Sequence, residues 1–144
     1  MEKTGWIEEP LYSQIRQLVP LACVDLLVVH RGRLLIMKRN NPPAKGEWFT
    51  PGGRIFTGES IEEAVRRTLN EETGLEPVNI EQKGVASHFW PEVQTVTVIH
   101  RVEVTDDSVT LNSEHHDYKW IDDITEDLHP YVKIMIEIGG IFTE

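Results

Sequence analysis

The sequence has little of several features that mark particular classes of protein. A single cysteine, Cys23, among 144 residues excludes an internal disulfide. The N-terminal segment MEKTGWIEEP lacks the apolar core of a secretory signal, so we expect a reduced, cytoplasmic protein. No apolar run approaches the roughly 18 residues that a membrane span requires, and we therefore expect no membrane partner.

Positive charge is also scarce. Lys and Arg number 14 against 24 Asp and Glu, which gives a net charge of −10. A field of that sign repels polyanions, so we expect no nucleic-acid partner, although a small anion can still bind locally. The balance is uneven: residues 31–54 hold six basic residues and one acid, a charge of +5, and the remainder carries −15. A solvated basic hairpin explains this segment as well as an anion site does, unless its side chains converge.

The pattern of apolar residues predicts one domain with alternating strands and helices. A chain of 144 residues suits a single domain, residues 1–144, in which residues 1–20 form an N-terminal helical extension. Apolar periodicity predicts helices at 9–18, at 61–73 and from 130, and strands at 21–29, 34–38, 83–90, 93–104 and 118–121. The order lacks a regular βαβ rhythm. We therefore expect an α/β protein of the α+β type, with a mixed sheet between helices.

The helix predicted at 61–73 has both of its ends marked. Ser60 precedes Glu63 by three residues, the spacing of a capping box, and Gly74 stands where a left-handed C-terminal cap belongs. A long loop with several prolines and glycines, residues 40–53, lies before this helix, and loops of this kind often carry function.

Two carboxylates near the end of this helix point to a metal site. Glu72 falls in the middle of the apolar arc, so its carboxylate is aimed at the core. Glu71 and Glu72 both occupy the last turn, where the helix dipole disfavours anions, and a divalent cation such as Mg²⁺ offsets that charge. The alternative is that Glu72 turns to solvent at a frayed end. Arg67 is spaced to bridge Glu63 and Glu71.

The 23 residues from Gly53 to Leu75 resemble the Nudix box. They read GRIFTGE, seven further residues, and then RTLNEETGL, so that all but one of the fixed positions of the box stand at the right spacing. The departure is Thr68, where the family normally has the glutamate of an Arg-Glu pair. In most Nudix enzymes that glutamate binds metal or acts as the base in attack on phosphorus, so its replacement argues against the usual route.

Further segments resemble the GDP-mannose mannosyl hydrolase branch of this family, which cleaves the glycosidic carbon–oxygen bond. They are PLACVD at 20–25, KRNNP at 38–42, WFTPGGR at 48–54, HF at 88–89 and HHDYKW at 115–120. The resemblance implies a Nudix-like fold and a Mg²⁺-dependent hydrolase, with Mn²⁺ as another usable ion. It also implies a nucleoside-diphosphate sugar of the GDP-mannose type as substrate, cleaved at the anomeric C–O bond, and a homodimer.

The same resemblance implies roles for single residues. The catalytic residues are His115 as the base, Asp25 near the sugar ring, His88, and two arginines on the diphosphate, Arg39 and Arg54. The substrate contacts comprise Asp25, Arg39, Arg54, His88 and Trp48. The metal ligands are the Gly52 carbonyl, Glu71, Glu72 and Glu114.

Other interpretations remain open on the residues alone. Asp25 interrupts an apolar strand and is also explained by a structural partner, and His88 by simple packing in a strand. Thr95 stands where the branch has a tyrosine near the diphosphate. A Nudix pyrophosphohydrolase of nucleoside triphosphates or related diphosphate derivatives, attacking phosphorus with Glu71 and Glu72, is the second candidate function. A catalytically silent nucleotide-binding module is the third.

Overall fold

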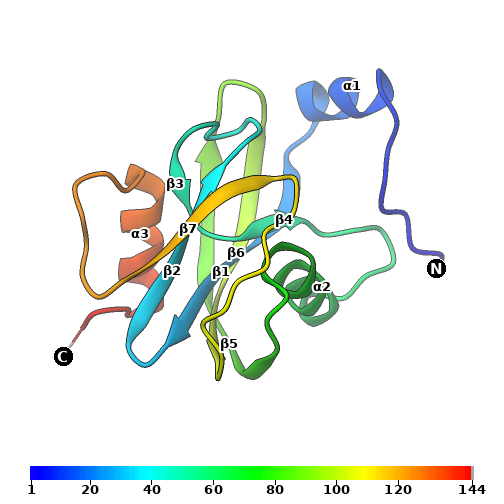
Figure 1. Cartoon of the computed structure of the whole chain (residues 1–144). Coiled ribbons are helices and arrows are strands. Elements are labelled where there is room, and N and C mark those ends of the chain that lie inside the picture. The colour runs from blue at the N-terminus through cyan, green and yellow to red at the C-terminus, as the bar shows by residue number, and fades with distance from the viewer. Residues whose placement is uncertain (144) are drawn as a thin grey trace.

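The computed structural model describes residues 1–143 and contains three helices and seven strands (Figure 1). In chain order they are α1 (Leu11–Leu18), β1 (Leu21–His30), β2 (Arg33–Arg39), β3 (Trp48–Phe49), β4 (Gly52–Arg54), α2 (Ile61–Thr73), β5 (Pro77–Phe89), β6 (Gln94–Val104), β7 (His115–Ile121) and α3 (Pro130–Gly139). In this described part of the chain no helix is long and apolar enough to cross a membrane.

The strands form one mixed sheet, as predicted. Its order is β3-β2-β1-β6-β5, while β4 pairs with β1 and β7 pairs with β2. β1 runs parallel to β6, and the remaining pairs are antiparallel. One edge of β1 is shared, because its end pairs with β2 at Val29 and His30 whereas its beginning pairs with β4 between Cys23 and Asp25. The sheet therefore splits beside Asp25.

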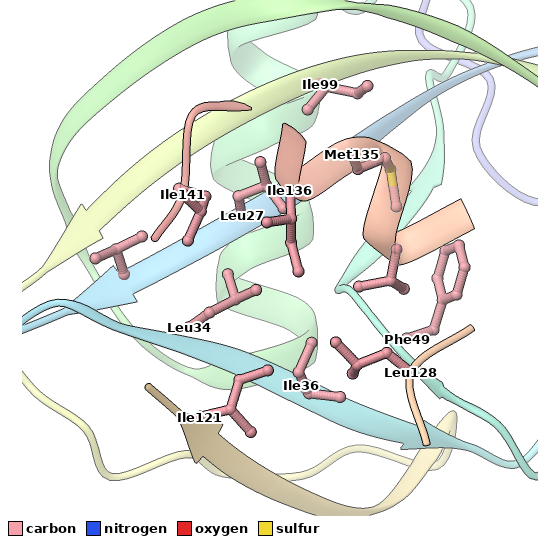
Figure 2. Close-up of a cluster of buried hydrophobic side chains, with 12 residues drawn as sticks. Leu27, Leu34, Ile36, Phe49, Ile99, Ile121, Leu128, Met135, Ile136 and Ile141 are labelled. Carbon is pink, nitrogen blue, oxygen red and sulfur yellow. The ribbon is translucent and has the colours of Figure 1, made fainter. Parts of the chain in front are cut away.

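The core has two layers, one on each face of the sheet. Alternate residues of β1 enter different clusters: Leu27 and Val29 pack toward α3, and Leu26 and Val28 pack toward α2. Figure 2 shows the first cluster, in which side chains of α3 meet those of β1 and β2. Burial on both faces explains why the strand reads as an uninterrupted apolar run. The predicted arrangement, a mixed sheet between helices, is confirmed.

Helix α2 begins and ends where its sequence signals predict. The Ser60 hydroxyl accepts a hydrogen bond from the Glu63 amide at 3.1 Å, and the Glu63 carboxylate accepts one from the Ser60 amide at 3.2 Å. Gly74 adopts the left-handed conformation with φ 70°. The predicted bridge from Arg67 to Glu63 is wrong, because Glu63 pairs with Lys3 instead. The Glu63 carboxylate thus faces the N-terminal segment rather than Arg67.

Some element boundaries differ from those predicted. β5 begins at Pro77 rather than at 83, because pairing with β6 continues through residues that are exposed and carry little apolar alternation. The loop predicted at 40–53 contains the short strands β3 and β4. Helix α1 buries none of its side chains, and it lies apart from the sheet in Figure 1. The N-terminal extension is therefore tied to the domain mainly by the segment before α1, which pairs Thr4 with Thr57.

Candidate active site

A cleft of about 520 Å³ opens where the sheet splits. It lies between the beginning of β1, the loop 40–53, the end of α2 and the end of β5. Eight of the predicted site residues line it: Asp25, Arg39, Gly52, Arg54, Glu71, Glu72, His88 and Glu114. His115 and Trp48 are not among the lining residues. The split sheet thus brings together residues that are up to 89 positions apart in the sequence.

Asp25 is a buried carboxylate whose two oxygens are both held. The Thr50 hydroxyl donates to Oδ1 at 2.9 Å, and the Thr97 hydroxyl donates to Oδ2 at 2.6 Å. Burial raises the pKa of Asp25 to about 6, although both hydroxyls and the charge of Arg39 act in the opposite direction. The structural partners are therefore neutral hydroxyls rather than a cation. An acid held in this way keeps a fixed position in the wall of the cleft.

Glu72 is buried, as its place on the apolar arc predicts. Its Oε2 accepts a hydrogen bond from the Gly52 amide at 3.0 Å. Its Oε1 has no hydrogen-bond partner within residues 1–143, and His115 Nε2 lies 3.6 Å from it. Burial and the nearby charge of Glu114 raise the pKa of Glu72 well above its usual range. A cation beside Glu72 would give the unpaired Oε1 a partner and would offset the repulsion between Glu72 and Glu114.

The donors around Glu72 fit a hard divalent cation that keeps much of its water. In the described part of the chain, no three His, Cys, Asp or Glu side chains are grouped closely enough to hold a metal by themselves. Mg²⁺ requires few protein carboxylates and retains several waters, so a buried carboxylate oxygen with a second acid nearby suits it. Glu71 also lines the cleft, but its carboxylate is 57% exposed and paired with Arg67 at 3.2 Å.

Only part of the basic segment converges on the cleft. Arg39 and Arg54 line it. Arg39 Nε donates to the Pro43 carbonyl at 2.8 Å, which fixes the plane of its guanidinium. Arg54 donates to the carbonyls of Gly5 and Ile55, so the N-terminal segment also fixes this side chain. Two guanidiniums with fixed planes can each present paired N–H groups to phosphate oxygens.

The family of the chain follows from a match to the protein family described as NUDIX domain, which covers residues 20–128. The chain belongs to the NUDIX domain family. It is 37% identical over 124 residues to the low-salt glycan biosynthesis protein Agl8 of Haloferax volcanii, a match that covers 80% of this chain and 79% of that protein. A shorter match of 58 residues is 45% identical to an ADP-ribose pyrophosphatase of Methanocaldococcus jannaschii and covers 40% of this chain and 34% of that enzyme.

Solved NUDIX structures share the fold. A MutT NUDIX hydrolase from Burkholderia pseudomallei superposes with a TM-score of 0.74 at 25% identity, covering 83% of this chain and 97% of that one. The NUDIX domain of Shewanella oneidensis NrtR, solved in complex with ADP ribose, superposes with a TM-score of 0.61 at 30% identity, covering 71% and 72%. The predicted Nudix-like fold and hydrolase family are therefore confirmed.

Within the Nudix box, the structure shows an ion pair that the sequence analysis missed. Arg67 Nε lies 2.6 Å from Glu59 Oε2, and its Nη2 donates to Glu59 Oε1 at 3.0 Å and to the Arg54 carbonyl at 2.9 Å. The guanidinium carbon lies 3.5 Å from the centre of the Phe56 ring. These contacts hold the loop before α2 against the helix. The signal was present, since Glu59 and Arg67 are both fixed positions of the box, but Glu59 precedes the helix, so the spacing of side chains along the helix does not pair it with Arg67.

Thr68, the departure from the box, faces the same region. Its side chain is buried, and its hydroxyl has no hydrogen-bond partner in the described chain. A Cβ placed on Gly53 would lie 3.9 Å from this hydroxyl oxygen. Thr68 therefore places a short polar group behind the glycine pair, at the position where the box normally has a glutamate.

His115 and Trp48 lie outside the lining of the cleft. The His115 side chain is fully buried and reaches the site only through Glu72. Its burial, together with the charges of Arg39 and His116, lowers its pKa to about 4, so the imidazole is neutral at neutral pH. The Trp48 ring is flanked by two lysine amines, 4.4 and 5.6 Å from its centre. Because side chains alternate along β3, the next residue, Phe49, lines the cleft instead.

The aromatic side chains around His88 were also missed. His88 lines the cleft together with Phe49 and Trp90, and Tyr131 of α3 stacks on its ring. The sequence carried no local signal for this contact, since Tyr131 lies more than 40 residues from β5 and only the packing of α3 on the sheet brings it close.

Proposed function

We propose that this protein is a Mg²⁺-dependent hydrolase of a nucleoside-diphosphate sugar of the GDP-mannose type. Water adds to the anomeric carbon, the C–O bond to the diphosphate breaks, and the products are a nucleoside diphosphate and the free sugar. The observation that carries the proposal is Asp25, a carboxylate held buried in the cleft wall by two hydroxyls. Burial makes this carboxylate costly to keep charged, and in the proposed site it stabilises positive charge that develops on the sugar ring.

The metal-binding residues in this proposal are the Gly52 carbonyl, Glu72, Glu114 and Glu71. Their support is the buried Glu72 Oε1, which has no hydrogen-bond partner in the described chain, and the presence of Glu71, Glu72 and Glu114 in the lining of one cleft. A bound Mg²⁺ or Mn²⁺ ion would withdraw negative charge from the departing diphosphate. The glycine at position 52 is required for a separate reason, because a Cβ there would lie 2.6 Å from Asp25 Oδ1.

The diphosphate and the sugar are assigned to different residues of the cleft. Arg39 and Arg54 bind the diphosphate oxygens and stabilise the leaving group. Asp25 lies beside the anomeric carbon, and His88 contacts the sugar. Trp48 remains in the proposal as an outer substrate contact, although Phe49 is the neighbouring side chain that lines the cleft.

His115 is the proposed base, and it acts from a buried position. As a neutral imidazole it can accept the proton that the attacking water loses. Its Nε2 lies 3.6 Å from Glu72 Oε1, and through this contact it reaches the cleft. The attacking water is assigned to the face of the sugar opposite the diphosphate. Attack from that face inverts the configuration at the anomeric carbon.

Attack on phosphorus is the second candidate function. The observation that favours it is the otherwise intact Nudix box, in which Arg67 holds Glu71 next to the buried Glu72. Relatives named an ADP-ribose pyrophosphatase and an NrtR domain in complex with ADP ribose are in keeping with this route. The likeness to a glycan biosynthesis protein over most of both chains is in keeping with a sugar substrate. Thr68 supports attack at carbon over attack at phosphorus, because the glutamate used by the usual route is absent.

The proposal includes a homodimer in the cytoplasm. Several large apolar side chains of the N-terminal extension and β5 are exposed in the single chain, among them Trp6, Leu18 and Phe89 at 86%, 78% and 67%. A second copy of the chain would cover such residues. The free Cys23 thiol suits reducing surroundings.

Products identified by mass test the proposal. The protein is incubated with Mg²⁺ and a panel of nucleoside-diphosphate sugars, ADP-ribose and nucleoside triphosphates. We expect a nucleoside diphosphate and a free sugar from one member of the panel. A nucleoside monophosphate as the product would establish the second candidate instead. Glu72→Gln should abolish turnover, while Glu76→Gln, an exposed acid just beyond the box, should not.

A further inference from the structure

Helix α3 places one tyrosine against two consecutive residues at the end of β5. The ring of Tyr131 stacks on that of His88, with centroids 4.2 Å apart and planes inclined by 3°. Its hydroxyl accepts a hydrogen bond from the Phe89 amide at 3.0 Å and approaches the Phe89 carbonyl at 3.3 Å. The stack fixes the plane of the His88 imidazole, and the hydroxyl contacts fix the backbone of the next residue, Phe89.

One ring nitrogen of His88 is buried in the wall of the cleft without a partner in the described chain. Its side chain is only 2% exposed, and its Nε2 has no hydrogen-bond partner among the described residues. Burial and the nearby His129 lower the pKa of His88 to about 4, so the neutral ring has one N–H donor and one acceptor nitrogen. A buried polar atom that lines a cleft and lacks a partner is a place where a ligand can bind.

Tyr131 stands behind the aromatic wall rather than in it. The wall consists of Phe49, His88 and Trp90, which line the cleft, whereas Tyr131 does not. The Trp90 ring packs edge-on against Tyr131 at 4.9 Å and against Phe49 at 5.4 Å. Tyr131 therefore contacts two of the three wall residues and can affect a ligand only through them.

We propose that Tyr131 is a positioning residue, which holds His88 and Trp90 in the orientation that binds the sugar of the substrate. The assignment of the sugar to this end of the cleft rests on the proposed function. The chemistry of the wall suits such a ring: apolar aromatic faces pack against its C–H groups, and one fixed imidazole nitrogen bonds a hydroxyl. Tilting of the His88 ring would aim that nitrogen elsewhere, and the stack on Tyr131 holds the plane of the ring.

Two substitutions separate the contributions of Tyr131. Tyr131→Phe keeps the stack and removes the hydroxyl contacts, whereas Tyr131→Leu removes both. For the substrate that is turned over, we expect KM to rise about tenfold in Tyr131→Leu, the equivalent of one hydrogen bond to the substrate, and about threefold in Tyr131→Phe. The value of kcat should change less than KM in both. Ile134→Ala, on the exposed side of α3, should change neither.

A double-mutant cycle distinguishes positioning from a loss of fold. In a His88→Phe background, Tyr131→Leu should raise KM far less than tenfold, because the contact through His88 is gone and only the contact with Trp90 remains. Equal effects of Tyr131→Leu with and without His88 would overturn the proposal. If Tyr131→Leu does not fold, the same cycle with Tyr131→Phe decides: the threefold rise should occur only where His88 is present.

The stack also has a readout that needs no substrate. In protein labelled with ¹³C-histidine, the ring resonance of His88, assigned by its loss in His88→Phe, should be shifted upfield by the Tyr131 ring. The shift should persist in Tyr131→Phe and disappear in Tyr131→Leu. An unchanged resonance in Tyr131→Leu would refute the positioning contact. If the spectra are as expected but the protein hydrolyses no nucleoside-diphosphate sugar, the contact between Tyr131 and His88 is established and the proposed function is refuted.

Discussion

The burial of Asp25 has a consequence for stability that Asp25→Asn measures. The carboxyl has a pKa of about 6 in the folded chain against 3.8 for an ordinary aspartate, mainly because burial disfavours its charge. The folded state therefore holds this proton more tightly than the unfolded state does. The free energy of unfolding therefore falls as the pH rises from about 4 to 6, and above about pH 6 it falls no further on account of this group. An asparagine carries no charge at any pH and avoids that loss.

The size of the effect follows from the two pKa values. The interval from 3.8 to about 6, at about 1.4 kcal/mol for each tenfold change in proton affinity, corresponds to about 3 kcal/mol. In the parent chain the hydroxyls of Thr50 and Thr97 both donate to the carboxylate of Asp25. In Asp25→Asn the side-chain NH₂ replaces one carboxylate oxygen and must itself donate to one of these hydroxyls. One poorer hydrogen bond costs about 1 kcal/mol. The variant should thus be about 2 kcal/mol more stable at pH 8 and no more stable than the parent at pH 4.

Urea denaturation in buffer containing EDTA tests this expectation without interference from bound metal. Free energies of unfolding are measured for the parent chain and Asp25→Asn at several values between pH 4 and pH 8, together with hydrolysis at pH 8. The difference between the two proteins should grow up to about pH 6, then level off, while Asp25→Asn loses activity. A difference that stays constant with pH would show that Asp25 is not held at a raised pKa, and the reasoning about its burial would fail.

Three further substitutions probe the box and the core. Glu72→Gln should lower kcat by at least about a hundredfold and abolish the rise in unfolding temperature that Mg²⁺ produces in the parent chain, as differential scanning fluorimetry would show. Glu59→Ala should lower the free energy of unfolding by about 3 kcal/mol, because it leaves the Arg67 guanidinium without its buried partner. Lys3→Ala breaks only an exposed pair and should lower the free energy of unfolding far less; equal losses in urea would contradict this. Gly139→Ala should cost about 1–3 kcal/mol in the same assay, since the added Cβ overlaps a core leucine of β1, and an unchanged midpoint would contradict the packing.

Local signals in the sequence predicted the parts of the fold that local interactions determine. The capping box at Ser60 and the glycine at 74 place the ends of α2 correctly, because the hydrogen bonds concerned join residues three or four apart. The burial of Glu72 followed from its position on the helical arc. The extent of β5 did not follow, since its first half is exposed and is held as a strand by backbone pairing with β6.

The site was predictable to the extent that the Nudix box determines it. Eight of the expected residues line one cleft, but they meet there through long-range contacts that cannot be read from the spacing of residues in the sequence. Asp25 meets Thr97 only because β1 and β6 run in parallel, and His88 meets Tyr131 only because α3 packs on the sheet. The outward position of Trp48 follows from the register of β3, a strand of two residues that the sequence does not reveal.

The direction of attack is the central claim, and hydrolysis in ¹⁸O-labelled water tests it most directly. The substrate identified from the panel is hydrolysed with Mg²⁺, and both products are examined by mass spectrometry. Attack at the anomeric carbon places the label in the free sugar and leaves the nucleoside diphosphate unlabelled. Label in a phosphate group would show attack at phosphorus and would contradict the roles assigned to Asp25, His88 and His115.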